Sequence, residues 1–360
     1  MNGDIFEELF VLELANNHYG DVERGKKIIT DFSRIVRFNN VKAAIKLQFR
    51  DVEHFIHKDF INRDDLRYIK KTRDTKMSQD QYGVLVEAIK KASCIPMSTP
   101  FDEKSVDICE NLGIEIIKIA STDINDWVLI EKIAKTRKPV IVSTGGSSLK
   151  DIDDIVKFFD NRKIPLAINH CVSIYPSEKS QLELNQIDFL KKRYPNHVIG
   201  FSTHEENPDL EIPMYMAYAK GARTFERHID IEYNGVTVSK YCSLPSDIDK
   251  WIKAYKKAKS ICGSPSEYKK IPSTNEVEYL DAMVRGVYAK QDFKAGDILH
   301  DANVYLAIPL QKGQISCREL MSGEVLLKDI KKDEPIMIDD IDSPYAYNQD
   351  LKHSIYQRGL

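Results

Sequence analysis

The sequence predicts an α/β fold, a (β/α)8 TIM barrel over residues 1–262 followed by a small, mostly-β module over residues 282–343. Short apolar runs rich in β-branched residues alternate with amphipathic charged segments, and this alternation occurs eight times before the texture of the chain changes. Eight strand–helix units within roughly 250 residues match the size of a closed parallel barrel. A doubly wound sheet would need a glycine-rich loop after its first strand, and "ELANNHYG" is not one.

Each of the eight expected strands is a short run of mainly apolar residues. They are "LFVLELA" (9–15), "AAIKLQF" (43–49), "CIPMSTP" (94–100), "EIIKIAS" (115–121), "PVIVSTG" (139–145), "PLAINHCV" (165–172), "HVIGFSTH" (197–204) and "RTFERHI" (223–229). Apolar residues recur at helical spacing between them, as in "DVERGKKIITDFSRIV" (21–36), "EKSVDICENLG" (103–113) and "SLKDIDDIVKFFD" (148–160).

Beyond the barrel the chain becomes polar. Residues 263–281 are rich in proline and serine and predict a linker. In residues 282–343 short strands are interrupted by the turns "KAGD" and "KKDE", which predicts a compact all-β module. Residues 344–360 have no clear pattern and form either a tail or a packing arm.

The composition is that of a globular protein with small ligands. The net charge is −3, so nothing in the charge balance favours nucleic acid or an anionic membrane. The first residues carry acids rather than a basic leader, and no apolar run reaches the length of a membrane span. The six cysteines show no CxxC spacing, which favours reduced thiols. We therefore expect a cytoplasmic protein.

The active site of a TIM barrel lies at the C-terminal ends of its strands, and here those ends are polar. They carry Glu13, Asn16, Asn17, His18, Lys46, Gln48, Ser98, Thr99, Lys118, Ser121, Ser143, Thr144, His170, Ser173, Tyr175, Ser202, His204, Glu226 and His228. A single serine or threonine at such a place is more often a helix N-cap. Lys46 and Lys118 are harder to dismiss, because an unpaired buried ammonium is costly, and with the hydroxyls they suit a phosphate.

His204 and His228 end neighbouring strands, which places both imidazoles on one rim of the barrel. One such histidine would more often be a hydrogen-bonded structural residue. Two together could share a divalent metal, with open positions suited to a Lewis acid.

The ordered motifs "ELANNHYGD", "IKLQ", "STPFD", "IKIAS", "VSTGG", "HCVSIYP", "IGFSTH" and "FERHI" resemble the sialic acid synthase family. This family comprises the N-acetylneuraminate synthases and their legionaminic and pseudaminic acid relatives. The segments "DFKAGDIL" and "DIKKDEPI" resemble its C-terminal antifreeze-like SAF domain, a β-clip fold. The resemblance covers nearly the whole chain.

The resemblance implies condensation of phosphoenolpyruvate (PEP) with an N-acetylmannosamine-like aldose, giving a 2-keto-3-deoxy acid and phosphate. It implies a divalent metal at His204 and His228, Mn2+ first with Mg2+ or Co2+ as alternatives. The catalytic residues would be Glu13, which orients or deprotonates a water, with Gln48 and Tyr175. The PEP-binding positions would be Lys46, Thr99, Lys118, Ser121, Ser143, Ser173 and Ser202, and the sugar side would involve Asp123, Tyr175 and Ser239.

Four departures from the family pattern affect the expected substrate. Ser173 replaces an asparagine, Asp123 replaces a glutamate, and Ser239 stands where relatives have a sugar-contacting aspartate. Ile308–Pro309 replaces an Arg–Pro that reaches the partner's site in the family's swapped dimer. We expect such a domain-swapped homodimer here, and an acceptor that is less polar or differently functionalised than N-acetylmannosamine.

Two other functions stay open. One is a synthase of a shorter 3-deoxy keto acid, whose phosphorylated acceptor would need a further basic pocket. Arg50, Arg223 and Arg227 are available for it, although Arg227 better fits a structural or rim role. The other is a non-catalytic binding homologue, which the retention of both histidines and both lysines disfavours.

Overall fold

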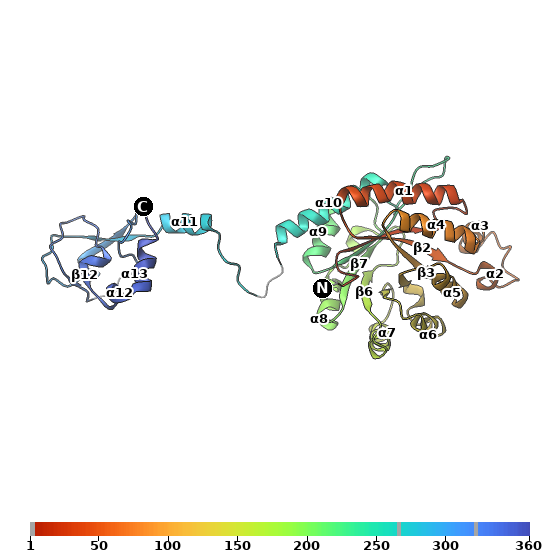
Figure 1. Ribbon diagram of the computed structural model, residues 1–360, viewed down its shortest axis with the longest axis horizontal. Coiled ribbons are helices and arrows are strands. Elements are labelled where there is room, and N and C mark those ends of the chain that lie inside the picture. Colours follow the sequence, from red (N-terminus) through yellow and green to blue (C-terminus); the bar gives the residue numbers. More distant parts are fainter. Residues whose placement is uncertain (1–3, 265–267, 320–322) are drawn as a thin grey trace. The chain divides into compact units, whose positions relative to one another are not determined.

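A computed structural model describes residues 4–264, 268–319 and 323–360. It divides into two units, Met1–Pro265 and Ser266–Leu360. The first unit is a closed barrel of eight parallel strands in sequential order, surrounded by helices (Figure 1). All eight predicted strands are present, so the predicted barrel is confirmed.

The barrel strands are short and the helices between them vary in length. The strands are β1 (Leu9–Ala15), β2 (Ala43–Phe49), β3 (Ile95–Pro100), β4 (Ile116–Ile119), β5 (Val140–Ser143), β6 (Leu166–Cys171), β7 (Val198–Thr203) and β8 (Thr224–His228). The helices are α1 (Val22–Asn39), α2 (Val52–Phe55), α3 (Arg67–Asp74), α4 (Gln79–Lys91), α5 (Glu103–Asn111), α6 (Trp127–Lys135), α7 (Leu149–Asn161), α8 (Asn185–Arg193), α9 (Glu211–Ala219) and α10 (Pro245–Cys262), with 3-10 turns η1 (Ser121–Asp123) and η2 (Lys179–Gln181).

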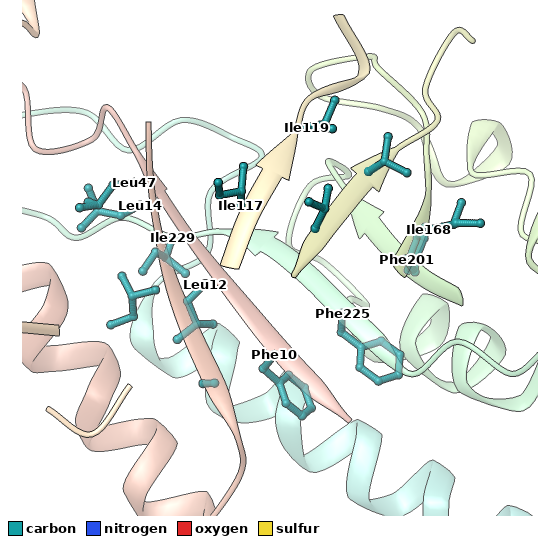
Figure 2. Packing of buried hydrophobic residues seen from close by; sticks show 14 of the residues in the cluster. Phe10, Leu12, Leu14, Leu47, Ile117, Ile119, Ile168, Phe201, Phe225 and Ile229 are labelled. Atoms are coloured by element: carbon teal, nitrogen blue, oxygen red, sulfur yellow. The ribbon is translucent and has the colours of Figure 1, made fainter. Parts of the chain in front are cut away.

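Side chains alternate between the two faces of each strand, which builds two separate apolar cores. Phe10, Leu12 and Leu14 face outward and pack between the sheet and its helices, where Phe10 meets Phe225 at a ring-centroid distance of 5.6 Å (Figure 2). The intervening Leu9 and Val11 belong to a smaller core with residues of β2 to β6. That smaller core fills the lower interior of the barrel and leaves its C-terminal mouth to polar residues.

Within residues 282–343 of the second unit the regular structure is mostly β-strand, as predicted, and helices flank it on both sides in the sequence. The unit contains α11 (Thr274–Ala282), β9 (Gly286–Ala289), β10 (Val304–Ala307), β11 (Val325–Leu326), η3 (Ile338–Asp340), β12 (Ile341–Asp342), α12 (Pro344–Tyr347) and α13 (Gln349–Tyr356). Strands β9 and β10 pair antiparallel, as do β11 and β12. Its own apolar core includes Val287, Phe293 and Ile336.

Two stretches are more ordered than the sequence analysis expected. Helix α11 begins inside the predicted linker, because Ser273 and Glu276 form a reciprocal capping box at its start. Helix α13 lies within the unpatterned last residues, and its Ile355 is fully buried in the core of the second unit. The end of the chain is therefore a packing arm and not a free tail.

Two further properties bear on the expected setting of the protein. All six cysteines are free, four of them buried and two exposed. No helix in the described part of the chain is long and apolar enough to cross a membrane. The compartment of the protein stays a prediction.

Candidate active site

A cavity of about 500 Å³ opens at the C-terminal ends of the barrel strands. Most of the side chains singled out from the sequence line it, and they come from all eight strand ends and the loops that follow. These are Glu13, Asn16, Asn17, Lys46, Gln48, Thr99, Lys118, Ser121, Ser143, Ser173, Tyr175, Ser202, His204, Glu226 and His228. The structure thus brings together residues that lie up to 215 positions apart, from Glu13 to His228.

Glu13 occupies a central place in the strand register. Its Cα is paired with Lys46 on β2 and with His228 on β8. The Lys46 ammonium forms ion pairs with Glu13 and with Glu226, the latter at 2.7 Å between Nζ and Oε1. The Gln48 amide lies 3.4 Å from the second Glu13 oxygen. A buried carboxylate–ammonium–carboxylate triad therefore forms the floor of the cavity.

This triad corrects one step of the sequence argument. The sequence predicts an unpaired buried ammonium at Lys46 that needs an anionic ligand, but two carboxylates already compensate its charge. Burial lowers the pKa of Lys46 to about 8 against the opposing effect of Glu226. Burial acts to raise the pKa of Glu226, but Lys118 and Lys46 outweigh it and hold that pKa at about 2. Lys46 and Glu226 are therefore both charged at neutral pH.

The expectation of an anionic ligand still holds for Lys118. It is buried, and its ammonium donates to the Ser143 hydroxyl at 2.6 Å and to the Ile119 carbonyl at 3.2 Å. No carboxylate among the described residues lies within ion-pair distance of it. A buried cation whose partners are only neutral oxygens is poised to take an anion.

A compact set of hydroxyl groups lies beside Lys118. The Ser121 hydroxyl accepts a hydrogen bond from the Gly145 backbone N–H at 3.0 Å. A Cβ at Gly145 would come within 2.2 Å of the Ser173 hydroxyl and 3.0 Å of the Ser121 hydroxyl. Only glycine at this position lets both hydroxyls approach the backbone, which makes a cradle of small donors suited to phosphate oxygens.

His204 and His228 meet at the rim, with ring centroids 5.3 Å apart. The His204 Nδ1 lies 3.0 Å from the Val172 carbonyl oxygen, which can only accept, so Nδ1 carries the proton and Nε2 keeps its lone pair. Burial lowers the pKa of His204 to about 4 and that of His228 well below its usual range. Both rings are neutral at pH 7, and Tyr175 and Tyr241 pack against them.

These two imidazoles fit a divalent metal that keeps open coordination positions. They offer neutral nitrogen ligands, and the carbonyl partner of His204 is the kind of outer contact that orients metal ligands. Glu226, two residues before His228, has a buried Oε2 without a hydrogen-bond partner among the described residues. That part of the chain holds no cluster of three or more histidine, cysteine, aspartate or glutamate side chains able to bind a metal.

Some residues predicted for the substrate side do not line the cavity. Asp123 lies in η1, where its Oδ2 is buried without a partner, and burial raises its pKa to about 6. Ser239 lies in the loop after β8, outside the lining. Ile308 belongs to the second unit, where it is half-exposed. The assignment of these residues to the sugar stays a prediction.

Of the three arginines proposed for an additional phosphate pocket, only Arg50 lines the cavity. Arg227 is fully buried and pairs with Glu205 at 2.8 Å, so its role is structural. Arg223 forms an ion pair with Glu7, which precedes β1 and therefore lies at the opposite end of the barrel.

The segment between β2 and β3 contributes a wall of the cavity that was not predicted from the sequence. Four residues of α3 line the cavity, namely Arg67, Tyr68, Lys71 and Thr72. This segment follows a strand end, like every other part of the site. Arg67 and Lys71, four residues apart on α3, were the sequence feature that could have indicated this wall.

Comparisons with known proteins agree with this geometry. Residues 39–267 match the NeuB family model, and residues 284–342 match the SAF domain model. Among curated relatives, the N,N'-diacetyllegionaminic acid synthase of Campylobacter jejuni is 26% identical over 91% of this chain and 98% of its own. The N-acetylneuraminate-9-phosphate synthase of Drosophila melanogaster is 27% identical over 81% of this chain and 78% of its own.

Solved structures agree as well. A Chromobacterium violaceum protein named for spore coat polysaccharide biosynthesis superposes with a TM-score of 0.87 at 36% identity, covering 94% of this chain and all of that one. The N-acetylneuraminic acid synthetase of Leptospira borgpetersenii gives a TM-score of 0.68 at 25% identity over 79% of this chain and 96% of its own. The Chromobacterium violaceum structure thus resembles this chain over most of its length.

Proposed function

The chain belongs to the NeuB family, and from that membership we propose that it is a PEP-dependent condensing synthase, a transferase that joins C3 of PEP to the aldehyde of an aldose. The products would be a nonulosonic-type 2-keto-3-deoxy acid and inorganic phosphate. The observation that carries the proposal is Lys118, a buried ammonium that lies among hydroxyls and has no carboxylate partner in the described chain.

PEP binding follows from the donors around Lys118. In this proposal Lys118 and the hydroxyls of Ser121, Ser143 and Ser173 hold the phosphate, because together they offer a cation and several donors to its oxygens. Thr99 and Ser202 extend the donor set. Lys46 stays a predicted PEP contact, held at the floor by its two carboxylates.

His204 and His228 would hold the metal, and when bound it would act as a Lewis acid on the aldehyde oxygen. Tyr175 and Tyr241 border the imidazoles and confine the acceptor. We keep Mn2+ as the proposed ion, with Mg2+ or Co2+ as alternatives.

In this proposal Glu13 acts on the water that adds at C2 of PEP. Its carboxylate is held by the Lys46 ammonium on one oxygen and approached by the Gln48 amide on the other. A carboxylate fixed in this way can accept a proton from water as the C–C bond forms. Loss of phosphate from C2 then leaves the ketone, so the overall balance is PEP plus aldose plus water giving keto acid plus phosphate.

We further propose that the protein acts as a domain-swapped homodimer in the cytoplasm. The SAF domain that follows the barrel supports the first part, because the resemblance implies that this domain covers the partner's site. Sedimentation of the full chain would test the oligomeric state.

The deciding experiment is phosphate release from PEP with Mn2+ across a panel of aldoses. The panel contains N-acetylmannosamine, mannose, the diacetamido sugars of legionaminic and pseudaminic synthesis, and arabinose 5-phosphate. Release that requires one sugar and stops with a chelator would support the synthase, and release with arabinose 5-phosphate alone would indicate a shorter 3-deoxy acid. Silence together with failure to bind PEP would reject the synthase in favour of a non-catalytic homologue.

A further inference from the structure

The α3 wall of the cavity carries positive charge that is separate from the donors around Lys118. The lining as a whole holds five lysine and arginine side chains and two glutamates. Both glutamates, Glu13 and Glu226, form ion pairs with Lys46, and Lys118 is the cation proposed for the PEP phosphate. The other three cations are Arg50 at the end of β2 together with Arg67 and Lys71 on α3; these three residues are called the basic wall.

The cations of α3 fall into two classes. Those outside the cavity lining are paired, Lys70 with Asp74 at 2.7 Å and Arg73 with Asp64 at 2.6 Å. Arg67 and Lys71 line the cavity, and neither side chain forms an ion pair or hydrogen bond with another residue in the described parts of the chain. The two cations of α3 that line the cavity, exposed Arg67 and half-buried Lys71, are therefore the ones without a partner in the described residues.

Leaving Arg67 and Lys71 without partners has an energetic cost in the free protein. They are four residues apart on one helix, where like charges repel. Lys71 is also partly buried, and burial followed by the charges of Arg67 and Arg50 lowers its pKa. A bound anion would relieve this repulsion.

The guanidinium of Arg50, the third residue of the basic wall, is held in place by two contacts. It lies 3.6 Å from the centroid of the Phe101 ring and donates to the Gln48 side-chain oxygen at 3.1 Å. No described carboxylate lies within ion-pair distance of it, although Asp102 and Asp123 act on it from further away. A guanidinium fixed at one edge keeps its remaining N–H groups available to an oxyanion.

We propose that the basic wall binds an anionic substituent, a phosphomonoester or a carboxylate, that the acceptor aldose carries away from its aldehyde. This inference rests on the proposed synthase function. PEP has its own donors around Lys118, and the aldehyde belongs beside the two imidazoles. The remainder of the acceptor is then left to face the wall. A cavity of about 500 Å³ has room for both substrates.

The inference also selects between the two expectations for the acceptor. A less polar aldose would offer no partner to Arg67 and Lys71, whereas an aldose with an anionic substituent would offer one. The changed acceptor is therefore a differently functionalised aldose and not a less polar one.

The test compares Arg67→Ala and Lys71→Gln with Lys70→Gln, a control on the same helix whose lysine is outside the lining. Kinetics are measured with PEP and three acceptors: N-acetylmannosamine, N-acetylmannosamine 6-phosphate and mannuronic acid. Loss of one charge-assisted contact should raise KM for a charged acceptor by about 10- to 100-fold. KM for PEP should change by no more than about twofold, and Lys70→Gln should behave as the wild type.

The two charged acceptors identify the anion, since the wall variants penalise whichever of them it binds. A neutral acceptor preferred by the wild type and unaffected by the variants would overturn the inference while leaving the synthase intact. KM for PEP rising as much as KM for the acceptor would also overturn it, because the wall would then belong to PEP.

If none of these three acceptors turns over, calorimetry decides the wall separately from the synthase proposal, which is rejected only if PEP also fails to bind. Binding of N-acetylmannosamine 6-phosphate or mannuronic acid that is about 10-fold weaker in Arg67→Ala than in the wild type supports the anion site. Equal binding in the two proteins rejects it.

Discussion

At the scale of single residues, the burial of Lys46 and Lys118 could be predicted from the sequence, but their partners could not. Both are polar positions in apolar strand runs, and their burial followed from that pattern. Their partners did not, because Glu226 lies 180 residues from Lys46 and only the closed barrel brings them together. The same separation explains why the sequence could not distinguish a compensated lysine from one that awaits an anion.

Lys118→Ala should raise KM for PEP by about 10- to 100-fold while changing KM for the acceptor much less. The physical reason is that a hydrogen bond to a charged group contributes about 1.5 to 3 kcal/mol, and Lys118 serves PEP. Steady-state kinetics with each substrate varied in turn check this result. Lys135→Ala, at the exposed end of α6, is the control and should match the wild type. Equal increases for both substrates would contradict the phosphate assignment.

Asp123→Asn should stabilise the protein more at pH 8 than at pH 5. Burial raises the pKa of this carboxyl to about 6, so the native state retains a proton that the unfolded state has already released. The stability contributed by that proton is present at low pH and is lost as pH rises through about 6. Asparagine cannot ionise and avoids the loss.

Urea unfolding of wild type and Asp123→Asn at the two pH values measures this difference, expected at about 1 kcal/mol. Asp301→Asn is the control variant, because it removes one carboxylate as well, but from an exposed position. An Asn variant whose advantage is the same at pH 5 and pH 8 would show that the carboxyl is not protonated in the native state.

At the scale of elements, the regular parts of the barrel followed from hydrophobic period, whereas α3, α11 and α13 did not. Helix α3 buries no residue, so it has no apolar stripe for the pattern to reveal. Helix α11 could have been found from "STNE", a serine followed three residues later by glutamate. Helix α13 has one fully buried side chain, too few to set a period.

Ile355→Ala should loosen the second unit. Ile355 is fully buried in that unit's core, and removing its outer methyl groups leaves a cavity that costs about 2 to 4 kcal/mol. Hydrogen exchange of the full chain should show faster exchange over residues 284–342 and unchanged exchange in the barrel strands. Ile271→Ala is the matched control, because Ile271 is 91% exposed. Unchanged exchange in the Ile355 variant would mean that α13 does not stabilise the unit.

At the scale of the whole molecule, the order of strands was predictable while the chemistry of the second substrate was not. Eight alternating units specify a closed parallel barrel, and the barrel gathers every strand end at one mouth. Catalytic positions on strand ends are therefore readable from sequence. The proposed acceptor contacts come from α3, whose side chains reach the cavity through the path of the chain between β2 and β3.

Removing the metal should abolish turnover without unfolding the protein. The two proposed ligands, His204 and His228, end strands whose stability comes from apolar cores on both faces of the sheet. Structural metal sites behave differently, since their domains unfold when the ion is removed. A chelator should therefore eliminate phosphate release, and added Mn2+ should restore it, while far-UV circular dichroism and cooperative melting persist. His228→Ala should lose activity in the same way, and His353→Ala, exposed on α13, should not. Loss of cooperative melting on chelation would make the ion a structural component, and full activity in chelator would remove it from the reaction.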